Sequence, residues 1–152
     1  MRHTLPEAFV RYHRGLGRMP MVWKPWLLAL LNANMILPWL FATRIEAQVV
    51  FGVALFTGAV FILLTAYSGF SRLLGLAHLP WIPLIVFLST RLSIVPADTP
   101  YGWWLRAVIV LNAGSVLLDA ANVVRYLAGD RDEMVAGLDY GARAWRAVGR
   151  GR

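Results

Sequence analysis

The chain has 152 residues, 59% of them hydrophobic, with a formal net charge of +7 and no cysteine. That hydrophobic share is too high for a soluble domain of this length, so the composition predicts an integral membrane protein. The lack of cysteine excludes disulfides, thiolate metal sites and cysteine nucleophiles. Because the basic residues gather near both ends of the chain, beside apolar runs, we expect them to contact anionic lipid headgroups rather than nucleic acid.

Four apolar runs are long enough to cross a bilayer as helices, and short connections join them. The predicted fold is all-α: a polytopic membrane protein with four transmembrane helices and short amphipathic interfacial helices at both ends. We expect a basic amphipathic N-terminal segment at 1–20, a transmembrane domain at 21–127 and a basic amphipathic cytoplasmic tail at 128–152. The spans are expected at about 22–43, 47–67, 73–91 and 105–126.

The N-terminal segment begins with Thr4-Leu5-Pro6-Glu7, a capping box with proline in the first turn, which predicts a short helix. Phe9, Tyr12 and Leu16 fall on one face and arginines on another, a pattern typical of a helix in the headgroup plane. A solvated tail without fixed structure is the alternative. A similar helix is expected after Asp130, and the predicted headgroup contacts of the two helices are Arg11, Arg14, Arg18, Arg143 and Arg146.

Polar and proline residues interrupt the first span. Asn32 and Asn34 are two positions apart and point in different directions, so only one can readily join a shared polar interior. Pro38 leaves the Asn34 carbonyl without its usual helical donor, which predicts a kink. Small residues elsewhere permit close helix approach, and we expect packing within the chain rather than a dedicated dimer motif. These residues are Gly52, Ala54, Gly58, Gly114 and Ala121.

The third span contains His78, Pro80 and Pro83. Two prolines three residues apart remove two backbone donors, which predicts a bent or partly unwound start to this helix. Such a start is tolerated in membranes where protein or water pairs with the freed carbonyls. The pattern therefore points to a polar cavity near His78.

The fourth span carries a polar stripe. On a helix its members lie on one face: Asn112, Ser115, Asp119 and Asn122. A charged aspartate at the centre of a bilayer costs about 2.5–3.5 kcal/mol on insertion scales, so we expect it to face protein or water. His78 lies at a similar depth from the same end of the bundle, and the two side chains could meet.

A buried cluster of this kind can carry protons or coordinate a hard cation, because imidazole titrates near neutral pH and intramembrane ionisable groups mark transport pathways. The proposed network consists of Asp119, His78, Asn122, Ser115, Asn112, Asn34 and Asn32. Alternatively, Asp119 pairs with Arg125 or Arg72 and the stripe only joins helices.

No metal-ligand spacing is present, and a Ser115, His78 and Asp119 hydrolase triad is not implied by spacing. We therefore expect no metal, no cofactor and no catalytic residue. The sequence favours a protein that is not an enzyme. A membrane-embedded enzyme ranks third among the possible functions.

The basic residues predict the orientation. Five lie in the N-terminal arm through Lys24, one in the second turn and six in the tail from Arg125, twelve of the fifteen in the chain. With four spans these segments share a side, so the positive-inside rule predicts cytoplasmic termini and a bacterial-type inner membrane. The leading hypothesis is an oligomeric channel- or transporter-like protein for protons, cations or a small solute. The alternative is an accessory or assembly subunit of a larger membrane complex.

Overall fold

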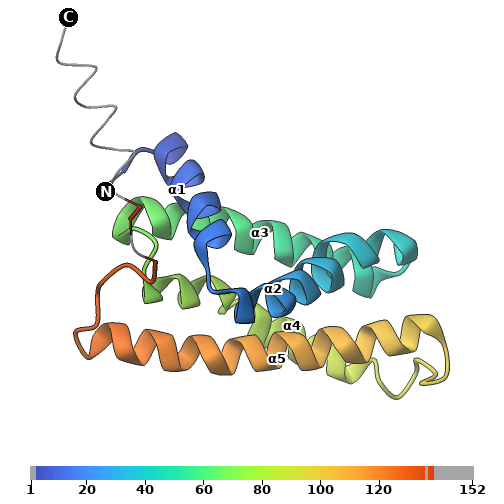
Figure 1. Ribbon diagram of the computed structural model, residues 1–152. Coiled ribbons are helices and arrows are strands. Elements are labelled where there is room, and N and C mark those ends of the chain that lie inside the picture. The colour runs from blue at the N-terminus through green and yellow to red at the C-terminus, as the bar shows by residue number, and fades with distance from the viewer. Residues whose placement is uncertain (1–2, 136, 139–152) are drawn as a thin grey trace, which may run out of the picture.

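A computed structural model describes residues 3–135, 137 and 138. All the secondary-structure elements named within this part of the chain are helices (Figure 1). The main helices are α1 (Leu5–Arg18), α2 (Lys24–Leu31), α3 (Ile45–Ser68), α4 (Trp81–Thr90) and α5 (Pro100–Leu127). Shorter turns of other types are η1 (Met21–Trp23), η2 (Asn32–Ile36), η3 (Leu37–Phe41) and η4 (Arg72–His78), of which η2 is a π-helix and the rest are 3₁₀. Helix α5 runs the length of the bundle, with α2, η2, η4 and α4 packed along it (Figure 1).

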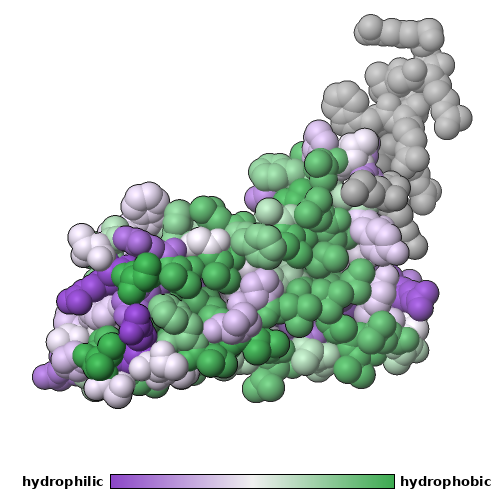
Figure 2. Space-filling view, turned by 180° about the vertical axis from the view of Figure 1, so that it is seen from behind, coloured by the Kyte–Doolittle hydropathy of each residue, from purple (hydrophilic) through white to green (hydrophobic). Residues whose placement is uncertain are grey.

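Three helical runs in the described part are long and apolar enough to cross a membrane: Ile45–Ser68, Arg72–Thr90 and Pro100–Leu127. Only 17% to 28% of the residues in their most apolar stretches are buried within the chain. Their remaining apolar side chains face outward, and Figure 2 shows hydrophobic residues over the middle of one face with hydrophilic ones gathered toward its ends. The all-helical class is confirmed, and three of the four predicted spans correspond to these runs.

The first predicted span, 22–43, is not one continuous α-helix. Helix α2 ends at Leu31, and the chain continues through the π-helix η2 and the 3₁₀ helix η3 to Phe41. A π turn widens the helix and a 3₁₀ turn tightens it, so side chains along this run follow no single period.

Pro38 accounts for the change of helix type, although not at the predicted carbonyl. The Leu37 N–H donates to the oxygen of Asn32, five residues back, so in this register Pro38 stands opposite Ala33 rather than Asn34. Proline has no N–H to donate. The Trp104 indole of α5 donates to the Ala33 oxygen instead, at 2.9 Å. The predicted kink is therefore a backbone irregularity whose free carbonyl is paired from another helix.

The third span has the unwound start that its prolines predict. The 3₁₀ helix η4 runs to His78, a turn follows at Leu79 and Pro80, and regular α-helix begins only at Trp81. The fourth span starts earlier than predicted, at Pro100, because the Thr99 side chain caps the helix by accepting the Gly102 N–H at 3.0 Å. Arg106 lies inside this helix, with its guanidinium on carbonyl oxygens of Gly102, Leu92 and Val95.

The chain ends differ from the expectation. Helix α1 forms with the predicted capping box, in which the Thr4 N–H donates to Glu7 at 2.9 Å. It lies against the end of α3, and Gly15 packs on the Phe70 ring (Figure 1). Among the described residues 130–135, 137 and 138, no helix begins at Asp130 and the chain is irregular; Arg143 and Arg146 lie outside the described residues.

Two hydrophobic cores hold the bundle. The larger core joins α3, α4 and α5 near the start of α5 and includes Val50, Leu84, Leu88, Leu105 and Val108. The smaller core lies at the other end and includes Phe70, Leu74, Val135 and Leu138. The polar stripe of α5 runs between these cores.

A Trp104→Phe substitution tests the role of the indole at Ala33. Loss of the donor leaves a backbone carbonyl unpaired at membrane depth, so we expect the free energy of unfolding to fall by about 1–3 kcal/mol. The measurement is unfolding by SDS titration in mixed micelles. Trp103→Phe is the matched control, because Trp103 is 67% exposed. Equal losses in both variants would contradict the assignment, whereas partial recovery when Pro38→Ala is added to Trp104→Phe would support it.

Candidate functional site

His78 and Asp119 meet. The Nδ1 atom of His78, at the end of η4, lies 2.5 Å from Oδ2 of Asp119 on α5. The two side chains are 12% and 22% exposed, so both lie mostly inside the protein. With Asp119 as a carboxylate, which only accepts, the Nδ1–H of His78 is the donor and Nε2 is the remaining site for a proton or an acceptor contact. We call this pair the His78–Asp119 couple.

Gly75 allows the couple to form. A Cβ atom at Gly75 would lie 2.9 Å from both Cβ and the carbonyl oxygen of Asp119, closer than real Cβ atoms approach other atoms. Only glycine therefore lets η4 lie this close to α5. Sequence reasoning missed this position, because a glycine in an apolar run does not indicate which helix it will touch.

Aromatic rings surround the imidazole. The Trp81 ring centroid lies 3.9 Å from that of His78, and the Phe61 ring lies 5.0 Å away, nearly perpendicular to it. Trp81 is fixed in turn, since its indole N–H donates to the Thr57 hydroxyl at 3.0 Å. The imidazole is therefore packed against one aromatic ring of α3 and one of α4.

Asn34 and Asn112 form a second contact along the stripe. Each amide donates to the other, at 2.9 Å in both directions, and both side chains are buried. Asn32 is exposed and donates to its own helix at Leu28. The prediction that only one of these two asparagines joins the interior is confirmed, and Asn32 lies outside the network proposed for it.

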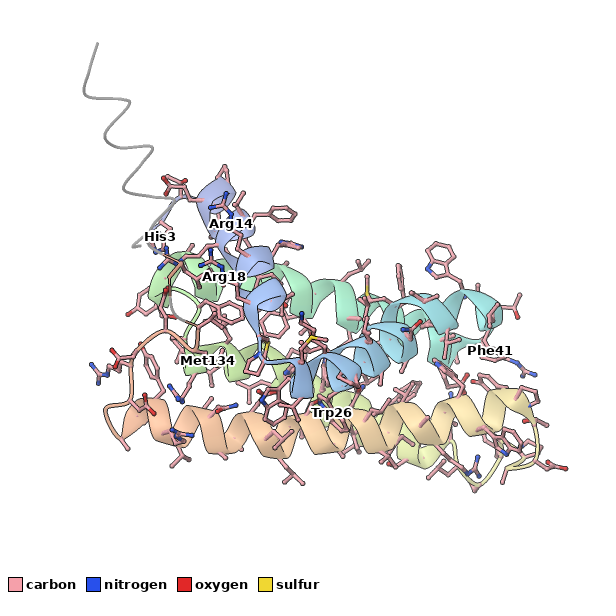
Figure 3. All side chains as sticks on the ribbon, viewed as in Figure 1. His3, Arg14, Arg18, Trp26, Phe41 and Met134 are labelled. Atoms are coloured by element: carbon pink, nitrogen blue, oxygen red, sulfur yellow. The ribbon has the colours of Figure 1, made fainter. Side chains whose placement is uncertain are left out.

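Ser115 forms a third contact. The Trp26 indole points from α2 toward α5 (Figure 3) and donates to the Ser115 hydroxyl at 3.2 Å. Gly114 lies beside it and provides room for the Trp26 ring, whose nearest atom would be 3.0 Å from a Cβ there. This hydroxyl is held by tryptophan rather than by histidine. Asn122 is half-buried, and no hydrogen bond joins its side chain to another described residue.

The arginines offered as alternative partners of Asp119 pair elsewhere. Arg72 and Arg125 both contact the Asp130 carboxylate, at 2.8 and 3.0 Å. Asp119 therefore pairs with the imidazole of His78 and not with either of these arginine guanidinium groups.

Two other groups of predicted residues need correction. Arg11, expected at lipid headgroups, is buried and pairs with Glu133 at 2.5 Å, whereas Arg14 is exposed and Arg18 donates to the Gly137 carbonyl. Among the small residues, Gly114 packs within the chain and Ala54 is half-buried, but three face outward: Gly52, Gly58 and Ala121. A repeat of small residues marks a smooth helix face without specifying what covers it.

Within the described part of the chain, no group of three or more metal-ligating side chains gathers in one place. No protein-family model matches the sequence, and comparison with curated proteins and with solved structures gave no match either. The arrangement itself therefore carries the functional argument: one titratable couple, and two paired polar contacts deeper along the same helix face.

The amide pair can be tested by a double-mutant cycle with Asn34→Leu and Asn112→Leu. Each single change leaves a buried amide without its main partner, so each should lower the free energy of unfolding by about 1–3 kcal/mol. The double variant should lose less than the sum, because no unpaired amide remains. SDS titration measures all three variants, and Asn32→Leu serves as the lipid-facing control. Additive losses would show that the two amides are not coupled.

Proposed function

We propose that the protein is a multi-pass membrane protein that binds and moves protons, cations or a small solute, with the His78–Asp119 couple as its binding site. One observation carries this proposal: an imidazole and a carboxylate lie 2.5 Å apart between two membrane-spanning runs. Such groups are costly in a bilayer and usually serve a transport or proton-relay role.

The depth of the couple supports access from one end. Asp119 lies eight residues before Leu127, the end of α5, and His78 lies six residues after the start of η4. At about 1.5 Å per residue, Asp119 is about 12 Å from its helix end. Beyond the couple, the Asn34–Asn112 and Trp26–Ser115 contacts fill the stripe with paired groups. In our proposal they close the path toward the far end, and transport requires them to separate.

We further propose that residues 21–41 make the first of four crossings, despite their broken helix types. The contact between Arg11 and Glu133 supports a common side for α1 and the end of α5, and Arg72 pairs with Asp130 at this end. The turn at Arg44 supports a crossing to the other end, because Phe41 packs on Tyr101 near the start of α5. This path retains the twelve-to-three distribution of basic residues and hence cytoplasmic termini in an inner membrane. Anionic headgroups would contact Arg14 on that side.

Proton flux into liposomes tests the proposal. We expect Asp119→Asn and His78→Gln each to lower the flux at least tenfold, because each removes one half of the proton-binding couple. Asp98→Asn and His13→Gln are matched controls, since both residues are exposed and neither belongs to the His78–Asp119 couple. A pH-sensitive dye inside the vesicles gives the rate. Wild-type vesicles that conduct neither protons nor common cations would refute the proposal.

A role as an accessory or assembly subunit is the second candidate. It is favoured by the small share of each long helix that is buried within the chain, and by Gly52 and Gly58, which face open space on α3. Homo-oligomerisation would cover the same exposed helix faces. The transporter-like oligomer and the accessory subunit therefore differ in activity rather than in packing.

Native mass spectrometry from lipid nanodiscs distinguishes the assemblies. We expect a defined oligomer or a fixed stoichiometry with another membrane protein, and a loss of that assembly in Gly58→Leu, because leucine holds the neighbouring helix away. Gly17→Leu is the control, since that glycine also faces open space but lies on α1. A monomeric wild-type protein in nanodiscs would contradict both the oligomer and the subunit.

A further inference from the structure

Three segments distant in sequence meet at the end of the bundle that carries most of the arginines. Glu133 joins them: its Oε1 atom accepts from Arg11 Nε at 2.7 Å, from Arg11 Nη2 at 2.5 Å and from the Phe70 N–H at 3.2 Å. The Met134 N–H also donates to the Phe70 oxygen at 2.9 Å. One carboxylate thus links α1, the turn after α3 and the segment after α5.

A hydrophobic layer lies beneath this carboxylate. Phe70, Leu74, Val135 and Leu138 are buried, and Tyr12 and Leu16 of α1 and Met19 just after it pack against the same cluster. Met134 lies close below α1 in Figure 3. Glu133 is 23% exposed and the Arg11 side chain 9% exposed, so the ion pair borders the solvent above the layer. The layer includes Leu74 of η4, so it joins α1 and the segment after α5 to the start of η4.

The layer reaches the His78–Asp119 couple through aromatic rings. The Tyr12 ring of α1 stacks on Phe61, with centroids 5.1 Å apart, and the Phe61 ring lies nearly perpendicular to that of His78. Burial raises the pKa of the Tyr12 phenol, as expected for a ring shielded from water. Helix α1 therefore covers the Phe61 ring that packs on His78.

We infer that α1 and residues 130–135, 137 and 138 form a cap that controls access of water and protons to the His78–Asp119 couple, and that Glu133 holds this cap closed. This inference rests on the proposed function. The polar contacts of Glu133 are charge-assisted, whereas the layer below is apolar and non-directional, so the carboxylate fixes the position of the cap. Helix α1 is joined to η1 through the two residues Met19 and Pro20.

Thiol labelling tests the cap directly, because the chain has no cysteine of its own. Leu74→Cys places a single thiol in the covered layer, where Leu74 is 4% exposed, and the full chain in nanodiscs is treated with a soluble maleimide. Adding Glu133→Gln should raise the labelling rate at least tenfold, since removing a charged hydrogen-bond partner shifts the opening equilibrium. Asp132→Asn is the matched control, an exposed carboxylate in the same segment that should leave the rate unchanged.

A second reporter, Val108→Cys in the other core, must stay unlabelled in every background. An unchanged rate at position 74, an equal rise with Asp132→Asn, or labelling of position 108 with Glu133→Gln would each overturn the inference. Proton flux separates the two hypotheses. If Glu133→Gln speeds both labelling and proton flux, and Asp119→Asn abolishes that flux, the cap and the proposed transport function are both supported. Faster labelling without any flux that depends on Asp119 leaves the cap standing and refutes the proposed transport function.

Discussion

Hydrogen-bonding groups at membrane depth have no water to pair with, and this constraint accounts for the polar contacts that join the apolar runs. The carbonyl of Ala33, left without a donor by Pro38, is paired by an indole from another helix. Asn112 faces Asn34, and Asp119 faces His78. Asn34, Asn112, Ser115 and Asp119 each have a partner from a different segment, whereas Asn32 bonds within its own helix. These pairs fix how the helices are placed, because lipid-facing apolar surfaces give little preference for one rotation over another.

Helix α5 is the scaffold on which these pairs are arranged. Its stripe meets the first run at Asn112 and Ser115 and meets η4 at Asp119. The same helix therefore binds the two least regular parts of the fold. Irregular backbone leaves carbonyls free and brings side chains closer than a regular helix would, and both features occur beside the candidate site.

The site combines a titratable couple with two closed polar contacts and an aromatic surrounding. Each part has a separate chemical role in our proposal: His78 and Asp119 hold the proton, Trp81 and Phe61 shield the imidazole, and the amide pair closes the path beyond. The cap adds a barrier on the other side of the couple. A site closed on both sides must open one side at a time in order to transport without leaking, and the two barriers differ in chemistry: a charged carboxylate on one side and a neutral amide pair on the other.

The sequence by itself determined the helical class, three of the apolar runs, the capping box of α1 and the unwound start of the third run. These follow from local chemistry: apolar length, a side chain capping its own helix, and prolines without N–H groups. It also indicated that Asp119 and His78 lie at the same depth, because depth follows from counting residues along straight helices. Tertiary structure alone decided that Arg11 turns inward to Glu133, that Gly75 lies against Asp119, and that Gly52 faces outward. These outcomes depend on how each helix is rotated about its axis, and that rotation is set by the joint pairing of polar groups across segments.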